Sequence, residues 1–342
     1  MDYLCKSEKM DFKKIIKFLV FLGILLLLTG CKSNGAPDSQ SARTYEKAYE
    51  VTDDEGNIVR MPRKPVRIFA THFHLENMLL GVVPQERVVA FSSTMDDPYV
   101  SFAEKDEFNK PIRVGYSVPL EQVLAMKPDL IIARKGIGKE MLQTYRELGI
   151  PVYVSSMPLT VKEMQEKITG IAAVTGEVEH GRVLNRKISE VLSEIDKRIP
   201  AKLQNSKSCL LVCKMNHNYG GKGCMFDDVC HHARIRNAAA DMGINNGELI
   251  SKEVMMKSDP DYFILSLSWE LRKGNGDTYK TEFLNDPALR YLHAVQEGHV
   301  IYTEDKYLYA SNQNCVWAIK KLANIAYGNV FPPEKEYFLK GF

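Results

Sequence analysis

The chain has 342 residues, of which 45% are hydrophobic and 26% are charged, and its net charge is +2. This length and composition suit a globular protein with two domains. A net charge so close to zero gives no sign of a nucleic-acid-binding surface, so nucleic acid is not expected as a partner.

The first thirty residues have the pattern of an export signal peptide. Lysines precede an unbroken apolar run over residues 18–28, which is too short to span a membrane. A short transmembrane anchor stays open as the alternative. Translation starts at either Met1 or Met10, and a start at Met10 gives the more ordinary signal length.

Leu28-Thr29-Gly30-Cys31 resembles a bacterial lipobox. That resemblance implies that Cys31 is acylated and becomes the first residue of an exported protein. The lipid would anchor the protein to the outer face of the cytoplasmic membrane, in a periplasm or at the cell surface. Residues 31–48 are rich in small polar residues and are expected to form a flexible tether.

Residues 49–176 are expected to form a first α/β lobe. A hairpin turns at residues 54–57, and apolar runs predict strands at 66–70, 87–91, 130–133 and 152–154. Helices are predicted from residue 75, from residue 120, over 139–148 and over 161–174. This alternation favours a parallel sheet covered by helices on both faces.

Residues 177–203 are expected to form one long amphipathic helix. Arg186–Glu190 and Glu194–Arg198 are spaced four apart on its polar face, where opposite charges support a helix. Pro200 kinks or ends it, and the span is roughly 35–40 Å at ~1.5 Å per residue. Its apolar face is formed by Leu184, Ile188, Val191, Leu192, Ile195, Ile199 and Leu203.

Residues 204–342 repeat the alternation as a second lobe. Strands are predicted at 209–213, 262–267 and 300–303, and helices at 225–233, 287–295 and 315–327. The five cysteines of this lobe are an odd set without a CxxC motif, so a structural zinc site is not expected. Buried free thiols are favoured, with a Cys224–Cys230 disulfide as the alternative.

An internal repeat relates the two lobes. Glu121 and Glu253 each open a helical segment of the same length that ends in Pro-Asp and a strand, at Asp129 and Asp261. Two lobes related in this way would enclose a cleft. The predicted fold is thus two Rossmann-like α/β lobes joined by a single long helix, with the ligand cleft between them.

These motifs resemble the substrate-binding proteins of ABC importers for iron–siderophore, haem and cobalamin. The resemblance is carried by residues 66–70, Glu76, 87–90, 114–115, 120–121, 127–132, 251–253, 259–261 and 292–302, within a span of about residues 50–327. It implies two lobes that hinge little about one helix. The sequence departs from that family at Asn237-Ala-Ala, where a double glycine is usual, and at Ser311-Asn-Gln, where Gly-Pro-Arg is common.

Candidate ligand-binding residues lie in the loops after the strands, where open α/β sheets bind ligands. These loops span residues 71–74, 92–102, 115–119, 134–138, 214–223, 266–270 and 303–313. Aromatic side chains suit the flat parts of a chelate, and imidazole and phenolate suit iron. The expected ligand-binding residues are His72, His74, Tyr99, Tyr116, His217, Tyr219, Trp269 and Tyr307, with Tyr309 nearby. His72, His74 and His217 are the candidate metal ligands, and an extended backbone would turn His72 and His74 to the same side.

The sequence shows no strong enzyme motif. Residues 115–119 lack the second glycine of a nucleophile elbow, and residues 136–139 lack the length of a phosphate loop. We therefore expect a lipid-anchored, monomeric binding protein without an intrinsic cofactor. It would capture a ferric siderophore or haem, or alternatively cobalamin, and deliver it to a permease dimer with its ATPase subunits. The resemblance implies that Glu121 and Glu253 dock on that permease. An enzyme such as a chelatase on a two-lobed fold, and a surface sensor that binds a partner protein, stay open as rivals.

Overall fold

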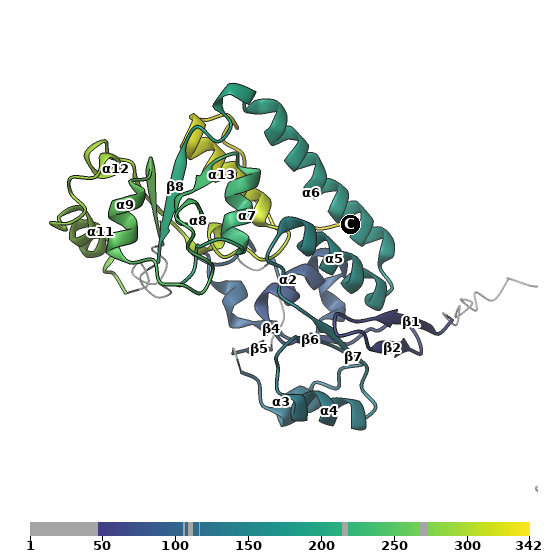
Figure 1. Ribbon diagram of the computed structural model, residues 1–342. Helices are drawn as coiled ribbons and strands as arrows, with labels where there is room; N and C mark the ends of the chain where they lie inside the picture. Colours follow the sequence, from purple (N-terminus) through teal and green to yellow (C-terminus); the bar gives the residue numbers. More distant parts are fainter. Residues whose placement is uncertain (1–46, 105–106, 109–111, 116, 214–217, 267–272) are drawn as a thin grey trace, which may run out of the picture. The chain divides into compact units, whose positions relative to one another are not determined.

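The computed structural model describes residues 47–104, 107–108, 112–115, 117–213, 218–266 and 273–342 (Figure 1). The chain separates into two units, residues 1–45 and 46–342, and every element described here belongs to the second. The export signal, Cys31 and nearly all of the tether lie outside the described residues. Within the described ranges, no helix combines the length and the apolar character needed to cross a membrane.

A hairpin opens the described chain. Strands β1 (Tyr49–Thr52) and β2 (Ile58–Met61) pair antiparallel, as predicted. The carboxylate of Asp53 accepts hydrogen bonds from the backbone N–H groups of Glu55 and Asn57, and Gly56 supplies the positive φ of the turn.

The first large sheet is parallel and has the strand order β3–β6–β7. A two-stranded parallel sheet of β4 (Phe91–Ser92) and β5 (Arg113–Val114) accompanies it. The strands of the larger sheet are β3 (Ile68–Ala70), β6 (Leu130–Arg134) and β7 (Val152–Ser155). The helices of this region are α2 (Phe73–Val82), α3 (Leu120–Ala125), α4 (Lys139–Glu147) and α5 (Val161–Thr175), with short 3₁₀ turns η1 (Gln85–Arg87) and η2 (Ser93–Asp96).

The second large sheet is also parallel, with the order β11–β10–β8–β9. Its strands are β8 (Ser208–Val212), β9 (Arg236–Asn237), β10 (Tyr262–Ser266) and β11 (Val300–Thr303). Its helices are α7 (Met225–His232), α8 (Ala238–Asp241), α9 (Lys252–Ser258), α11 (Gly276–Leu284), α12 (His293–Gln296) and α13 (Cys315–Tyr327), with the 3₁₀ turn η4 (Asp305–Tyr307) before α13. The predicted α/β class with parallel sheets is confirmed.

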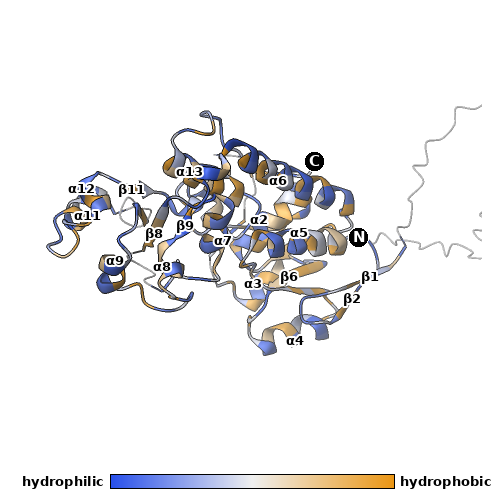
Figure 2. Ribbon diagram, turned by 45° about the horizontal axis from the view of Figure 1, so that its top comes forward, coloured by the Kyte–Doolittle hydropathy of each residue, from blue (hydrophilic) through white to orange (hydrophobic). Residues whose placement is uncertain are grey.

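Strand residues alternate between two sets of apolar partners. In β6, Leu130 and Ile132 face one core while Ile131 and Ala133 face another, and β8 alternates in the same way. The two outer cores lie against α3 and α4 on one sheet and against α8, α9 and α11 on the other. In Figure 2 the strand β6 is mostly orange, as expected for a strand buried on both faces.

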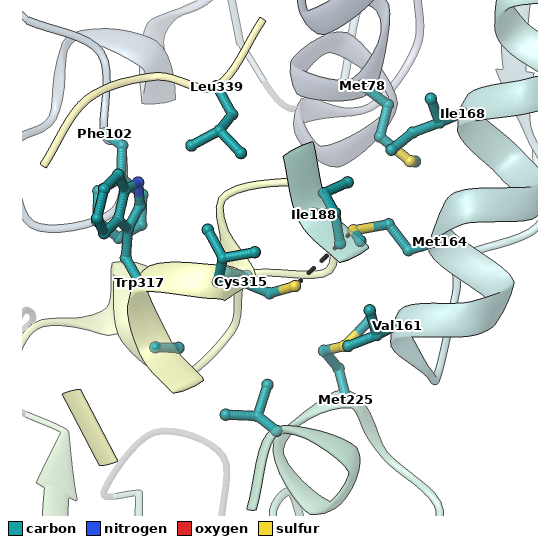
Figure 3. Close-up of a cluster of buried hydrophobic side chains, with 14 of the residues drawn as sticks. Met78, Phe102, Val161, Met164, Ile168, Ile188, Met225, Cys315, Trp317 and Leu339 are labelled. Carbon is teal, nitrogen blue, oxygen red and sulfur yellow. Dashed lines mark hydrogen bonds between the residues drawn. The ribbon is translucent and has the colours of Figure 1, made fainter. Parts of the chain in front are cut away.

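The inner faces of both sheets share one helical core. Side chains from α5, α6, α7 and α13 converge in it, and the Sγ of Cys315 lies 3.9 Å from the Sδ of Met164 (Figure 3). Met78 of α2 joins the same core. Strands on both sides of α6 in the sequence therefore contact a single packed interior.

Helix α6 (Val178–Arg198) lies in the chain between the two sets of strands. It has 21 residues, so it spans roughly 31 Å, and both predicted four-apart ion pairs are present. The prediction that it continues to residue 203 is wrong. Pro200 lacks the N–H needed to extend the helix and instead precedes a separate 3₁₀ turn, η3 (Ala201–Leu203), and Leu203 is exposed.

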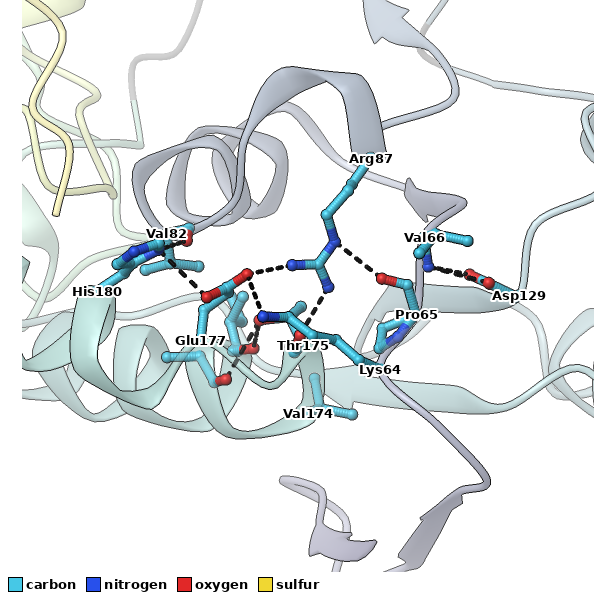
Figure 4. Close-up of polar contacts among 12 residues, drawn as sticks. Lys64, Pro65, Val66, Val82, Arg87, Asp129, Val174, Thr175, Glu177 and His180 are labelled. Atoms are coloured by element: carbon cyan, nitrogen blue, oxygen red, sulfur yellow. Dashed lines mark hydrogen bonds and ion pairs between the residues drawn. The ribbon is translucent and has the colours of Figure 1, made fainter. Parts of the chain in front are cut away.

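A polar cluster fixes the start of α6. The carboxylate of Glu177, the N-cap residue, pairs with Arg87, with Lys64 at 2.9 Å and with His180 at 3.3 Å (Figure 4). Arg87 also donates to the backbone oxygens of Thr175, at 2.7 Å, and Pro65, at 2.8 Å. The start of α6 is thus tied to the chain just before β3 and just after α2.

The C-terminal tail, residues 328–342, returns from α13 to α2 and α6. The backbone N–H of Gly341 donates to the backbone oxygen of Gly81 at 2.8 Å, and Lys187 donates to the backbone oxygen of Lys340 at 2.6 Å. Nothing in the sequence pattern predicted this tail, or β9, α8 and α11.

The five described cysteines are buried free thiols. The alternative of a Cys224–Cys230 disulfide is wrong, because the Sγ of Cys224 donates to the backbone oxygen of Gly221. The Sγ of Cys230 lies 3.6 Å from that of Cys209 instead.

Candidate functional site

The candidate site is built at the carboxyl end of strand β3, where the chain turns into α2. The hydroxyl oxygen of Thr71 accepts a hydrogen bond from the backbone N–H of Arg134 at 2.9 Å, which links the ends of β3 and β6. His72 keeps an extended backbone, with φ −150° and ψ 139°. Its Nδ1 accepts a hydrogen bond from the backbone N–H of His74 at 3.3 Å and so caps α2.

His72 and His74 lie side by side, with ring centroids 5.4 Å apart. The prediction that the helix begins at residue 75 is wrong, because α2 begins at Phe73, so the condition of an extended backbone through both histidines is not met. The rings are neighbours because one caps the helix and the other stands in its first turn. Since Nδ1 of His72 accepts a hydrogen bond, its imidazole proton lies on Nε2.

Both imidazoles are neutral at physiological pH. Burial, together with a smaller contribution from the nearby positive charge of Arg134, lowers the pKa of His72 to about 4. Burial, followed by the charge of a protonated His72, lowers the pKa of His74 to about 3. A neutral imidazole is the form that binds a metal ion.

Two cavities, each of about 180 Å³, flank the His72–His74 segment. We call the first the β3–β6 cavity. It is lined by Phe69, Thr71, His72, Ser117, Val118, Val123, Arg134, Ile137, Met141 and Tyr145. We call the second the α2–η4 cavity. It is lined by Phe73, His74, Asn77, Thr94, Val100, Phe102, Asp305, Lys306, Tyr309, Ala310 and Asn312.

The α2–η4 cavity lies between segments that are far apart in the sequence. The side-chain Nδ2 of Asn312 lies 3.3 Å from Nδ1 of His74, and the backbone N–H of Lys306 donates to the backbone oxygen of Tyr99 at 2.9 Å. Loops that follow strands of both sheets therefore meet there, and the roles of Tyr99 and His74 in ligand binding stay predictions.

Three predicted tyrosines lie close to this cavity. The rings of Tyr219 and Tyr309 lie 4.7 Å apart, and the Tyr309 hydroxyl donates to the Sγ of Cys213 at 2.8 Å. The Tyr219 hydroxyl donates to the backbone oxygen of Leu308 at 3.2 Å. Tyr307 packs edge-on against Phe102, and its hydroxyl donates to Glu336 of the tail at 2.5 Å. Burial is the main cause that raises the pKa of each of these tyrosines, so all three stay protonated.

Tyr116, His217 and Trp269 lie outside the described residues, so their roles stay predictions. Among the residues that are described, no group of three or more His, Cys, Asp or Glu side chains is placed to hold a metal ion. Among the described residues, His72 and His74 thus offer a pair of nitrogen ligands.

Glu76 is a buried acid beside the site. Both of its carboxylate oxygens accept from the backbone N–H of Ser92, at 3.0 and 3.1 Å, which fixes the start of the segment 92–102. Burial raises its pKa to about 8, although the Ser92 hydrogen bonds and the charge of Arg113 act in the opposite direction. Tyr99 and Phe102 belong to the segment that Glu76 fixes.

Arg134 and Tyr145 were not named among the candidate residues from the sequence. Arg134 is the last residue of β6 and Tyr145 stands in the last turn of α4, yet both line the β3–β6 cavity. The loop beginning at Arg134 was expected near the ligand, which was the one signal available. No spacing pattern marks Tyr145 as anything but a core residue.

Glu121 and Glu253 are absent from the lining of both cavities and occupy matching places in the chain. Each is exposed in the first turn of its helix, α3 or α9. Glu253 pairs with Lys257 at 2.7 Å.

The chain matches known proteins over most of its length. The sequence profile described as "Periplasmic binding protein" matches residues 78–307. The iron-uptake system-binding protein of Bacillus subtilis is 24% identical over 304 residues, covering 84% of this chain and 90% of that protein. The Fe(3+)-citrate-binding protein YfmC of Bacillus subtilis is 22% identical over 311 residues, with 85% and 90% covered.

The fold is similar to solved structures as well. The periplasmic haem-binding protein RhuT from Roseiflexus sp. RS-1 in apo form superposes with a TM-score of 0.62 at 22% identity, covering 78% of this chain and 99% of RhuT. The matched family consists of solute-binding proteins, which removes the enzyme alternative. The chain therefore belongs to the periplasmic binding protein family.

Proposed function

We propose that this protein is the substrate-binding component of an ABC importer and that it captures an iron complex, either a ferric siderophore or haem. The observation that carries the proposal is the pair of neutral imidazoles, His72 and His74, between two cavities at the carboxyl ends of the strands. Imidazole binds iron, including iron in haem. Support comes from relatives named for iron uptake, Fe(3+)-citrate and haem.

The iron complex is cargo in this proposal, and the protein needs no cofactor of its own. The α2–η4 cavity, which contains segments following strands of both sheets, is the floor of a cleft between two lobes, residues 49–176 and 204–342. The helical region 177–203 joins the lobes. Aromatic side chains at the cleft, from Tyr99 to Tyr309, supply apolar contact for a flat chelate.

Delivery requires a membrane partner. In the proposal, acylation of Cys31 anchors the exported monomer to the outer face of the cytoplasmic membrane by the tether 31–48. Glu121 and Glu253 then contact the two halves of a permease dimer, which is powered by its ATPase subunits. Two equivalent acidic residues suit a partner with two equivalent basic sites.

Ligand titration tests the proposal. Haem, ferric citrate, a ferric hydroxamate and cobalamin are added separately while tryptophan emission and melting temperature are followed. We expect at least one iron complex to quench emission with a Kd on the order of micromolar or tighter (roughly −8 kcal/mol). Trp317, buried in α13 beside the tail, and Trp269 are the reporters. Cobalamin binding alone would select the alternative cargo, and no response to any compound would refute the ligand class.

The absorption spectrum of protein from its native host provides a second test, since haem, ferric chelates and corrins absorb differently.

A further inference from the structure

The β3–β6 cavity contains a positive charge without a negative one. Arg134 is the charged residue in its lining, and no Asp or Glu lines the part of the cavity that the structure describes. His72, which also lines it, is neutral at physiological pH. The remaining walls are largely apolar, formed by side chains such as Phe69, Val123 and Met141.

Arg134 differs from other half-buried arginines of the protein in having no partner for its guanidinium. Arg87 pairs with Glu177, and Arg113 pairs with Asp96 at 2.6 Å. The side chain of Arg134 makes no hydrogen bond or ion pair with any described residue, and only its backbone N–H is bonded, to Thr71. A guanidinium stays charged at every physiological pH, so a half-buried one without a counter-ion is expected to accept an anion.

Tyr145 supplies an independent observation. Its side chain is 1% exposed and lines the same cavity, yet its hydroxyl makes no hydrogen bond with the described part of the chain. Ser117, an exposed residue at the edge of the lining, has a hydroxyl without such a bond as well. Both hydroxyls can therefore donate a hydrogen bond to an acceptor group bound in the cavity.

The size of the cavity limits what can enter. At about 180 Å³ it is smaller than the roughly 300–1,000 Å³ of pockets that hold whole ligands. It has room for one functional group of a larger molecule seated against His72 and His74. A carboxylate accepts two parallel hydrogen bonds from the guanidinium fork and has further lone pairs for hydroxyl donors.

We propose that the β3–β6 cavity is a carboxylate subsite, in which Arg134, Tyr145 and Ser117 bind a carboxylate group carried by the captured iron complex. The subsite rests on the proposed function only for the identity of the molecule that carries the carboxylate. It makes the preferred cargo anionic and distinguishes it from neutral or cationic iron chelates of similar size.

Paired probes test the subsite. Haem, which has two propionates, is compared with its uncharged dimethyl ester, and ferric citrate is compared with an uncharged ferric hydroxamate. Metal-free citrate is titrated as well.

The variants are Arg134→Gln, Arg134→Lys and Tyr145→Phe. Arg146→Gln is the matched control, because Arg146 follows Tyr145 on α4 and points to solvent without a partner in the described chain. Melting temperatures show that each variant is folded.

In whichever pair binds, we expect the wild-type protein to prefer the carboxylate-bearing member by about tenfold or more. Arg134→Gln should lose that preference by weakening the carboxylate-bearing probe only. Arg134→Lys should keep part of it, Tyr145→Phe should lose a smaller part, and Arg146→Gln should behave as wild type.

The outcomes separate this proposal from the proposed function. Equal wild-type affinity for both members of a pair, unchanged in Arg134→Gln, overturns the subsite and leaves iron capture standing. Arg134-dependent binding of citrate without binding of any iron complex supports the subsite and overturns iron capture. Failure of every probe to bind overturns both.

Discussion

Asp129 and Asp261 make equivalent hydrogen bonds to the backbone beside the start of a strand, each in a separate sheet. The Asp129 carboxylate accepts from the backbone N–H groups of Val66 and Arg67, just before β3, and the Asp261 carboxylate accepts from the backbone N–H of Ser208, at the start of β8. The residue before each Pro-Asp, Lys127 or Asp259, has positive φ. The repeat seen in the sequence is therefore a repeat of structure, and Glu121 and Glu253 stand at equivalent places in it.

The first prediction concerns those two glutamates. Glu121→Arg combined with Glu253→Arg should abolish uptake, or ligand-stimulated ATPase activity, in a reconstituted transporter, and each single change should weaken it. Charges at the rim of an interface govern docking more than they govern distant ligand binding, so chelate affinity should stay within about threefold. Glu140→Arg, an exposed acid in the first turn of α4, is the control. Undiminished transport by the double variant would leave the glutamates only a helix-dipole role.

The second prediction concerns hinge motion. Helices α2, α5, α6, α7 and α13 share one core, and packed cores shift between discrete arrangements rather than deform continuously. Solution scattering curves of the described unit with and without ligand should therefore nearly superpose. A ligand-induced contraction of the radius of gyration by several Å would contradict this expectation.

The third prediction concerns the polar cluster at the start of α6. The side chains of Arg87 and Glu177 are 13% and 11% exposed, and burial already lowers the pKa of Arg87. Glu177→Gln leaves that guanidinium without its main counter-ion, so the free energy of unfolding should fall by about 2–4 kcal/mol. Urea denaturation measures it. Glu179→Gln, two residues along, removes an exposed pair with Arg182 and should change stability far less than Glu177→Gln does. Equal effects of the two changes would show that the cluster contributes little.

The fourth prediction concerns pH. The pKa values of His72 and His74, about 4 and about 3, lie below the ordinary 6.5, so the unfolded state binds more protons between these values. Their contribution to stability is present above pH 6.5 and is lost as the pH falls. The pKa of Glu76, about 8, lies above the ordinary 4.5, so its contribution is present below pH 4.5 and is lost as the pH rises toward 8. Each group contributes at most about 1.4 kcal/mol per pH unit.

Glu76→Gln isolates the acid. Between pH 6.5 and 8 the wild-type protein should lose stability through Glu76, whereas the variant should not. Below pH 6.5 the variant should gain stability more steeply with rising pH, because the histidines act alone. Thermal melts across this range measure both slopes. Arg113 and Asp96, which face Glu76 as an ion pair, keep their charges throughout. Parallel profiles for the two proteins would mean that Glu76 is not a buried titrating acid.

The fifth prediction concerns Gly81 of α2. A Cβ at this position would lie 2.8 Å from Cδ2 of Leu184 and 2.9 Å from Nε2 of Gln313. Alanine favours a helix over glycine by up to about 1 kcal/mol, but overpacking a core costs about 1–3 kcal/mol, so Gly81→Ala should lower the melting temperature. Gly115→Ala, with no atom within 4 Å of its added Cβ, should not. A more stable Gly81→Ala would show that α6 and Gln313 move aside freely.

Much of the fold follows from patterns that act locally. Buried strands appear as short apolar runs, and the two Pro-Asp stops mark where α3 and α9 end. The parts that were missed depend on distant partners. Strand β9 has two residues and exists because β8 offers it an edge, and α11 has few apolar positions on one side. Pro200 explains why α6 ends early. The sequence alone left open whether the proline ends this helix or only kinks it before Leu203.

The candidate site, too, could be predicted from the sequence only in part. Histidines and tyrosines in loops after strands could be named from residue type, since open sheets bind ligands there. Residue type could not show which atoms of these side chains already make hydrogen bonds. The Tyr307 hydroxyl, for example, donates to Glu336, which lies in the tail and far from Tyr307 in any sequence pattern. Arg134 and Tyr145 become candidates only because no Asp or Glu lines the described part of their cavity. A sequence does not show which polar groups lack a partner in the folded protein.

The tail also sets the order in which the protein can be completed. The ribosome synthesises the chain from the N-terminus onward, so the early segments begin to fold first. Yet Gly81 receives its hydrogen bond from Gly341, and Asn314, at the N-terminus of α13, holds the backbone N–H of Leu339. Helix α2, the first helix of the described chain, therefore gains this hydrogen bond only after residue 341 has been synthesised. A nascent chain that stops before residue 339 would lack both hydrogen bonds, although all the strands and helices described above would already be present.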